Sequence, residues 1–334
     1  MLYLIKAATA VSLAVSAESS VAQSVPLGAN LERFDYPAPV QWFVAPSQGQ
    51  PIRMAYIDMA PSVAPNGTTV APLHGKNFCA ATWGETARAL TALGYRVIAP
   101  DQVGFCKSSK PPGYQYSFHT MAELTRQLLD RAGAKRVILV GHSTGGILAT
   151  RFALLHPARV SKLVLVNPLG LNDTLAEGVP YTDLSTLRAE EAKTNAASIK
   201  AYQLRNYYHG EWRPAYDRWV TMLAGQYASP DGEIIRDAQA RLSDMIQTQP
   251  VAAELPRLRV PVSLIIGQRD LTAFRANTAP PGRREMVRTV PQAAEDAAKR
   301  IPNARLIRLE DLGHSPQVEA PDRFMQALRS AIAP

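Results

Sequence analysis

The 334-residue sequence predicts an α/β fold in which one mostly parallel sheet is covered by helices on both faces and carries a helical insertion. Two observations support this prediction. Short apolar runs alternate with segments of helical spacing along most of the chain, and the runs are apolar on both faces, as in buried parallel strands. From residue 171 to about residue 250 the alternation stops, and helix-like segments follow one another without a convincing strand.

The segments on either side of the insertion predict the strands and helices of the core. The expected strands are 52–60, 69–73, 96–100, 137–140, 162–166, 262–266 and 305–309. The expected helices are 80–93, 118–132, 144–155, 292–300 and 321–332. We therefore expect residues 23–170 and 251–334 to form one α/β core and residues 171–250 to form a helical lid.

The composition is that of a folded globular protein. Hydrophobic residues make up 46% of the chain and charged residues 19%, which excludes a disordered chain. The formal charge is +8, but the sequence has no run of Lys and Arg and no stripe of basic and aromatic residues, so a nucleic-acid partner is not expected. The excess charge indicates a basic outer surface; attraction to anionic substrates or to an anionic cell surface is the alternative.

The first 22 residues have the pattern of a signal peptide. Lys6 precedes an apolar stretch at 7–17, and the small residues at 20–22 favour cleavage before Gln23. An apolar helix that stays attached is the alternative. No other apolar segment is long enough to span a bilayer, so we expect a periplasmic or secreted protein without stable membrane insertion after cleavage.

The chain has two cysteines, Cys79 and Cys106, in loops that follow neighbouring expected strands. In a reducing cytosol they would be buried thiols, whereas in an exported protein they could form a disulfide. The sequence leaves both alternatives open.

Ser143 lies in the most informative segment of the chain, 137–146, which reads VILVGHSTGG. The order is strand, G-x-S-x-G and helix, and the glycines allow a sharp turn that exposes the serine above the sheet. The turn also places the serine at a helix N-terminus, where free N–H groups favour a developing negative charge. We expect Ser143 to be a nucleophile.

A serine nucleophile needs a base, and the base needs a carboxylate to orient it. His314 follows the last expected strand and fits as the base better than the other histidines, which lie in the elbow, at helix ends or in the lid. Asp270 follows the preceding strand and completes the chain order Ser, Asp, His. Asp173 is the alternative acid, and Asp311 is expected to structure its own loop.

The oxyanion of the transition state needs two backbone N–H donors. One is expected from Thr144, directly after the nucleophile. The other is expected from the loop that begins at His74 and Gly75, with Lys76 as the first choice and Asn77 as the second. His74 is expected to brace this loop rather than to act as a second base.

These segments together resemble the α/β-hydrolase superfamily, most closely its lidded branch of esterases, haloalkane dehalogenases, epoxide hydrolases and carbon–carbon bond hydrolases. The matching segments are HG at 74–75, DQVGF at 101–105, GHSTGG at 141–146, Asp270, and GH at 313–314. The resemblance spans roughly residues 50–334 outside the insertion and implies a Ser143–Asp270–His314 triad with an acyl-enzyme mechanism.

Several features narrow the choice within this branch. Its dehalogenases and epoxide hydrolases carry Asp at the elbow, so Ser143 argues against both. The H-G-G-P-G loop usual in proline iminopeptidases is not matched, and Cys106 stands where the next loop commonly has Gly. A metal, a nucleotide or an organic cofactor is not implied.

The expected function is a serine hydrolase that cleaves a carboxylic ester or lactone, with a small ester-like molecule as its partner. A carbon–carbon bond hydrolase of a vinylogous ketone is the enzymatic alternative, and a catalytically weak small-molecule binding protein is the alternative from another class. The aromatic residues Phe78, Phe105, Tyr207 and Trp212 are expected to line an apolar pocket, although lid aromatics also serve to pack a lid onto its core. The sequence does not indicate an oligomeric state.

Overall fold

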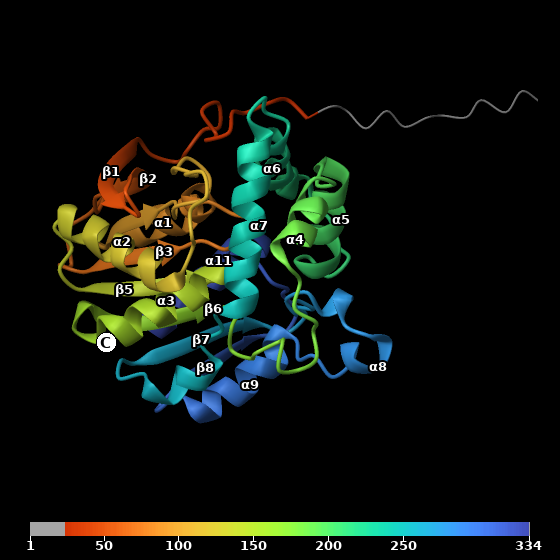
Figure 1. Ribbon diagram of the computed structural model, residues 1–334. Helices are drawn as coiled ribbons and strands as arrows, with labels where there is room; N and C mark the ends of the chain where they lie inside the picture. The colour runs from red at the N-terminus through yellow and green to blue at the C-terminus, as the bar shows by residue number, and fades with distance from the viewer. Residues whose placement is uncertain (1–23, 334) are drawn as a thin grey trace, which may run out of the picture.

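A computed structural model describes residues 24–333 and places an eight-stranded sheet between layers of helices (Figure 1). The strands are β1 (Val40–Ser47), β2 (Gln50–Met59), β3 (Thr69–Leu73), β4 (Arg96–Pro100), β5 (Val137–His142), β6 (Val160–Val166), β7 (Val262–Gly267) and β8 (Arg305–Leu309). Their order in the sheet is β1-β2-β4-β3-β5-β6-β7-β8. The predicted signal peptide, residues 1–22, lies outside the described residues.

The sheet is parallel from β4 through to β8, while β2 pairs antiparallel with both β1 and β4. This arrangement confirms the predicted fold class. Strand β1 was not predicted from the sequence. It lies at the edge of the sheet, and Trp42 and Val44 on it are exposed, so it lacks the apolar run that marks a buried strand. Pro46, near its end, further weakens the strand signal.

The helices outside the insertion form the two outer layers of the core, except for the short α8, which lies away from the sheet (Figure 1). They are α1 (Gly84–Thr91), α2 (Phe118–Arg131), α3 (Thr144–Leu155), α8 (Pro281–Arg284), α9 (Val290–Arg300), α10 (Pro316–Glu319) and α11 (Pro321–Ile332). The expected helix at 80–93 begins instead with a short 3₁₀ turn ahead of α1.

The two faces of the sheet have separate apolar cores. In β5, Val137 and Leu139 belong to the cluster with α2, α3 and α9, whereas Ile138 and Val140 belong to the cluster with α1 and α11. Successive side chains of a strand point to opposite faces, so every side chain of this central strand is buried. The continuous apolar run in the sequence follows directly from this double coverage.

Four α-helices, two short 3₁₀ helices and no strand lie between β6 and β7. The α-helices lie in the insertion. They are α4 (Leu184–Glu191), α5 (Ala196–Asn206), α6 (Asp217–Tyr227) and α7 (Gly232–Thr248). Figure 1 shows α7 standing beside the sheet with α4 and α5 on its outer side. Among residues 24–333, no helix combines the length and the apolar character needed to cross a membrane.

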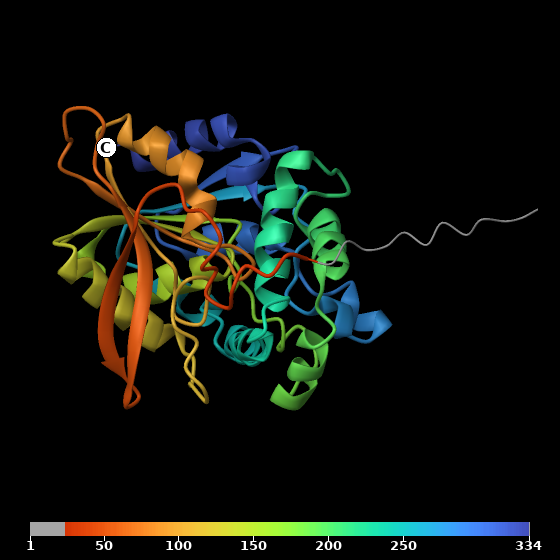
Figure 2. The same ribbon diagram turned by 90° about the horizontal axis from the view of Figure 1, so that it is seen from above.

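Residues 24–36, called the N-terminal arm below, cross from the insertion to the core (Figure 2). The N–H of Leu27 donates to the carbonyl oxygen of Gly225 in α6 at 2.8 Å, and the side chain of Gln226 donates to the carbonyl oxygen of Ala29 at 2.9 Å. On the core side, Nζ of Lys110 donates to the side-chain oxygen of Asn30 at 3.0 Å. The arm therefore joins α6 to the loop after β4.

Candidate active site

Ser143 lies at the sharp turn between β5 and α3, at the carboxyl edge of the sheet. Its φ of 54° is a conformation that residues with a side chain rarely adopt. A Cβ added at Gly141 would lie 2.4 Å from the carbonyl oxygen of Gly145, and one added at Gly145 would lie 2.3 Å from the carbonyl oxygen of Leu73. Only glycine fits at either position, so the G-x-S-x-G pattern is a steric requirement of this turn.

His314 is fully buried and forms a hydrogen bond with Asp270. Its Nδ1 lies 2.7 Å from Oδ2 of Asp270. Because an ionised carboxylate only accepts hydrogen bonds, Nδ1 carries the proton and Nε2 of the neutral ring has a free lone pair. Within residues 24–333, Nε2 has no hydrogen-bond partner. The imidazole is therefore oriented like a general base.

Asp270 is held by two further donors. The side-chain amide of Asn167 donates to Oδ2 at 2.8 Å, and the N–H of Thr272 donates to Oδ1 at 2.7 Å. Sequence reasoning missed Asn167, although a polar residue directly after an apolar strand at the carboxyl edge is a usable signal. The alternative acid, Asp173, accepts N–H groups of its own turn instead.

A second buried carboxylate, Glu319, holds the loop that carries His314. It accepts the N–H of Gly313 at 2.9 Å and the N–H of Ser315 at 3.1 Å, so it bonds the backbone on both sides of the histidine. Nε2 of His209, from the insertion, lies 3.3 Å from Glu319. Burial raises the pKa of Glu319 to about 7. This role of Glu319 was not predicted from the amino-acid sequence.

The backbone of His314 itself is bound by the insertion and by the elbow. Its N–H donates to the carbonyl oxygen of Tyr207 at 2.9 Å, and the Tyr207 ring stacks on the imidazole with centroids 4.6 Å apart. Nε2 of His142 lies 2.8 Å from the carbonyl oxygen of His314 and must donate to it. Burial and the neighbouring His314 hold the pKa of His142 well below its usual range, so this ring is neutral. His142 therefore braces the loop.

The loop after β3 lies directly against the elbow. A Cβ added at Gly75 would lie 2.8 Å from Cβ of Ser143, so only glycine lets this backbone approach the serine so closely. Lys76 follows it, and Thr144 is the first residue of α3, whose N–H has no acceptor within that helix. Nε2 of His74 accepts the N–H of Gln102 at 3.1 Å, which ties this loop to the loop after β4.

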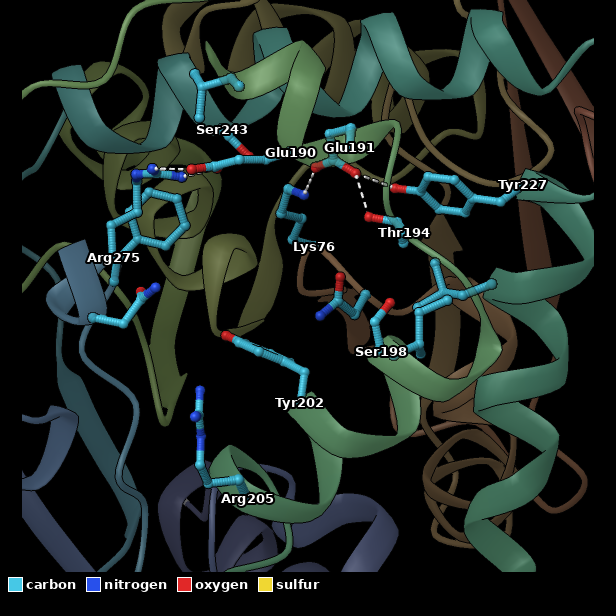
Figure 3. A pocket seen from close by; sticks show the side chains of 16 residues that line it. Lys76, Glu190, Glu191, Thr194, Ser198, Tyr202, Arg205, Tyr227, Ser243 and Arg275 are labelled. Carbon is cyan, nitrogen blue, oxygen red and sulfur yellow. Dashed lines mark hydrogen bonds and ion pairs between the residues drawn. The ribbon is translucent and has the colours of Figure 1, made fainter. Parts of the chain in front are cut away.

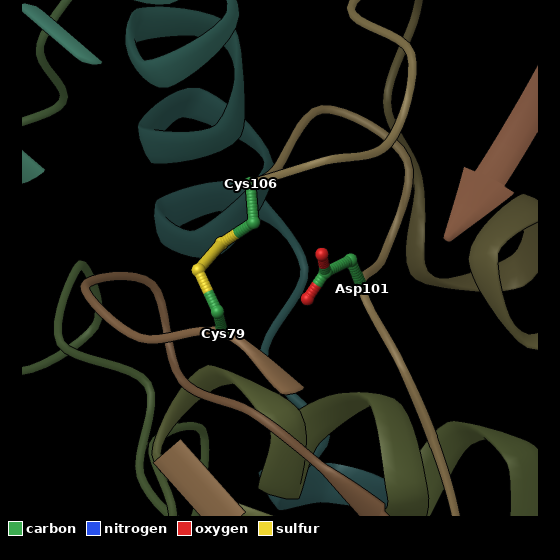
Figure 4. Close-up of side chains that lie close together, drawn as sticks. All are labelled: Cys79, Asp101 and Cys106. Atoms are coloured by element: carbon green, nitrogen blue, oxygen red, sulfur yellow. A yellow bond between two sulfur atoms is a disulfide. The ribbon is translucent and has the colours of Figure 1, made fainter. Parts of the chain in front are cut away.

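A disulfide between Cys79 and Cys106 joins the same two loops (Figure 4). The question that the sequence left open is thus answered in favour of pairing. Asp101 lies beside the bridge and accepts the N–H of Ala80 at 2.8 Å and that of Lys107 at 3.0 Å. Because both sulfur atoms are bonded to each other, this cluster offers a metal ion no thiolate. It is a structural brace next to the elbow.

A cavity of about 330 Å³ lies between the core and the insertion (Figure 3). Its wall includes Lys76 and Asn77 from the loop after β3, Arg275 from the loop after β7, and residues of α4 to α7. Since Lys76 follows Gly75, which touches Ser143, the cavity borders the elbow. Ser143 and His314 themselves are not among the residues that line it.

None of the four aromatic residues expected to form a pocket lines this cavity. Phe78 packs on Tyr207 with ring centroids 5.7 Å apart, and Phe105 packs on His74 at 5.1 Å. Trp212 packs against tyrosines of the insertion. Aromatic rings gain more by packing on one another than by facing water, so they fill the contact between insertion and core.

An eight-stranded, mostly parallel sheet with a serine elbow after its central strand defines the class of α/β hydrolases. The chain belongs to the alpha/beta hydrolase fold family, whose sequence model matches residues 73–321. It is a hydrolase of α/β fold.

Similar proteins show the breadth of this family. A crystal structure described as a probable hydrolytic enzyme from Pseudomonas aeruginosa PAO1 matches with a TM-score of 0.91 and 49% identity, over 93% of this chain and 100% of that one. A RutD protein of Stutzerimonas stutzeri, named for carbamate hydrolysis, is 28% identical over 273 residues, 80% of this chain and 93% of its own length. Lipase 1 of Psychrobacter immobilis is 26% identical over 236 residues, 69% of this chain and 66% of the lipase.

Proposed function

We propose that this protein hydrolyses carboxylic esters or lactones through an acyl-enzyme formed on Ser143. The observation that supports this proposal most directly is the buried His314, whose Nδ1 is bound to Asp270 while its Nε2 has no partner among the described residues. Such a histidine can accept the proton of a serine hydroxyl. The relative named a lipase supports an ester substrate in particular.

In the first half of the reaction, Oγ of Ser143 attacks the carbonyl carbon while its proton passes to Nε2 of His314. The negative charge that develops on the carbonyl oxygen is stabilised by the N–H groups of Thr144 and Lys76. The bond to the leaving oxygen then breaks, and His314 gives this oxygen the proton. An ester thereby releases an alcohol, whereas a lactone opens to a hydroxyacyl group that stays on Ser143. Asp270 stabilises the imidazolium that exists between these two transfers.

In the second half, a water molecule attacks the carbonyl carbon of the acyl-enzyme. His314 accepts a proton from this water, and the same two N–H groups stabilise the second oxyanion. The bond to Oγ breaks, and the proton returns from His314 to Ser143. The carboxylic acid leaves, and the enzyme is restored.

Labelling with a fluorophosphonate probe tests this proposal. We expect the wild-type protein and Ser161→Ala, a control at the far end of β6, to be labelled equally. Ser143→Ala should lose both labelling and several orders of magnitude in kcat while it stays folded. Labelling that persists in Ser143→Ala would contradict the proposed mechanism. A wild-type protein that is never labelled would favour the binding-protein alternative.

A panel of an aryl ester, a lactone, an aryl carbamate and a dienoate ketone then assigns the reaction. We expect the ester or the lactone to give the highest kcat/KM. Exclusive turnover of the dienoate ketone would replace our proposal with the carbon–carbon bond hydrolase alternative.

Export to the periplasm or the medium forms part of the proposal. Disulfides persist in oxidising compartments, so the Cys79–Cys106 bridge supports an exported protein. N-terminal sequencing of the protein from such a compartment should begin at Gln23. A mature protein that begins at Met1 would contradict export by cleavage.

A further inference from the structure

The cavity beside the elbow is small and bordered by charged groups rather than by apolar ones alone. Its volume of about 330 Å³ lies near the lower end of the range for small-molecule pockets. Lysine, arginine and glutamate side chains contribute to its wall, together with tyrosine and serine hydroxyls. This combination suits a short, polar substrate better than a long acyl chain.

Both carboxylates of the wall are already paired with a cation. Glu191 lies 3.0 Å from Nζ of Lys76 and accepts the hydroxyl of Tyr227 at 2.6 Å. Glu190 forms two hydrogen bonds with the guanidinium of Arg275, at 2.8 and 3.0 Å. The negative charges of the wall are therefore compensated within the protein.

Arg205 is a third cation of the wall, and it has no ion pair among the described residues. It lies in the last turn of α5, three residues after Tyr202, so the two side chains share one face of that helix. Figure 3 shows the guanidinium of Arg205 and the hydroxyl of Tyr202 directed into the same part of the cavity. Among the described residues of the wall, the exposed Arg205 is thus the cation without an ion pair.

Tyr202 also connects this corner to the reaction centre. Its ring packs edge-on against Tyr207 at 5.4 Å, and Tyr207 in turn stacks on His314. Burial, with the nearby charge of Asp270, raises the pKa of Tyr202 to about 12, so its hydroxyl remains a hydrogen-bond donor. A guanidinium fork and a neutral hydroxyl side by side are suited to an anion with two planar oxygens.

We propose that the cavity binds substrates that carry a carboxylate in addition to the scissile ester or lactone, and that Arg205 and Tyr202 hold this carboxylate. A monoanion balances the single free cation that the described residues of the wall provide, whereas a phosphate dianion would leave one charge without a partner. This inference rests on the proposed esterase activity, because it names the substrate class of the same site.

Two esters of equal length provide the test. Monophenyl glutarate and phenyl pentanoate differ only in that a carboxylate replaces the terminal methyl group. We expect the wild-type protein to prefer monophenyl glutarate. In Arg205→Gln, kcat/KM for monophenyl glutarate should fall about 10- to 100-fold, mainly through KM, while that for phenyl pentanoate stays unchanged. Lys193→Gln, which removes an exposed lid charge outside the cavity, should affect neither ester.

Equal kcat/KM values for the two esters in the wild-type protein, or equal losses for both in Arg205→Gln, would overturn the carboxylate site while leaving the esterase proposal intact. If Arg205→Gln does not fold, Tyr202→Phe should still raise KM several-fold for monophenyl glutarate alone.

A binding measurement makes the inference independent of turnover. In titration calorimetry with Ser143→Ala, monophenyl glutarate should bind at least about tenfold more tightly than phenyl pentanoate, and adding Arg205→Gln should abolish the difference. If neither ester is hydrolysed by the wild-type protein but this preference is observed, the esterase proposal fails and the carboxylate site stands. Equal binding of both esters would refute the site.

Discussion

Glu319 provides a direct test of how the loop around His314 is held. Its buried carboxylate bonds the N–H groups of Gly313 and Ser315 and lies 3.3 Å from Nε2 of His209. Burial raises the pKa of Glu319 from 4.5 to about 7, although the two N–H groups favour the ionised form. We predict that Glu319→Gln abolishes a pH-dependent loss of stability that the wild-type protein shows.

The sign and the size of this loss follow from proton linkage. Because the pKa of Glu319 is higher in the folded chain than in the unfolded chain, its contribution to stability is greatest below pH 4.5. As the pH rises towards 7 the unfolded chain ionises first, and the free energy of unfolding falls. Each pKa unit corresponds to about 1.4 kcal/mol, so the loss reaches about 3 kcal/mol and is constant above pH 7.

Urea unfolding between pH 4.5 and 8, followed by tryptophan fluorescence, measures the effect. From pH 4.5 to 7.5 we expect the stability of Glu319→Gln to rise by about 3 kcal/mol relative to the wild-type protein. Glu310→Gln, which removes an exposed carboxylate nearby, should show no such trend. Repeating both series with His209→Gln removes the titration of the neighbouring histidine. Parallel curves for wild type and Glu319→Gln in both series would refute the reasoning.

Two further predictions concern the supports of the site. Asn167→Ala removes the donor 2.8 Å from Oδ2 of Asp270, so steady-state kinetics should show kcat reduced about 10- to 100-fold with little change in KM; an unchanged kcat would contradict this support. Replacing Cys79 and Cys106 with serine opens a bridge that spans 27 positions, which should lower the free energy of unfolding in urea by about 3–4 kcal/mol. A loss below about 1 kcal/mol would contradict the expected restriction of the unfolded chain.

The core of the fold could be predicted because its signals are local. Doubly covered strands such as β5 are apolar at nearly every position, and the elbow at Ser143 requires glycines at fixed spacing. Strand β1 escaped prediction because it lies at an edge, where one face meets water and the apolar pattern is weak.

The surroundings of His314 could not be predicted because they depend on contacts between distant segments. The backbone carbonyl of Tyr207 accepts a hydrogen bond from this loop. Every residue has such a carbonyl, so the residue type does not predict the bond. Glu319 acts only because α10 turns back onto the loop before it. The lining of the cavity differs from the expected aromatic pocket for a similar reason. Phe78 and Tyr207 pack on each other, and side chains from several separate elements line the cavity instead.

The N-terminal arm limits how the insertion can move. An insertion joined to a core only at its two chain connections can swing as a rigid flap, but here α6 is also fastened by Leu27 and by Gln226, the latter reaching Cys106 in the core at 3.2 Å. Any opening of the insertion on the side of α6 must first break these hydrogen bonds. The opposite side is fastened as well, because Glu191 and Glu190 of α4 pair with Lys76 and Arg275 of the core, so contacts of both α4 and α6 hold the insertion in place. Because the N-terminal arm makes part of these contacts, an affinity tag for handling the protein belongs at the C-terminus.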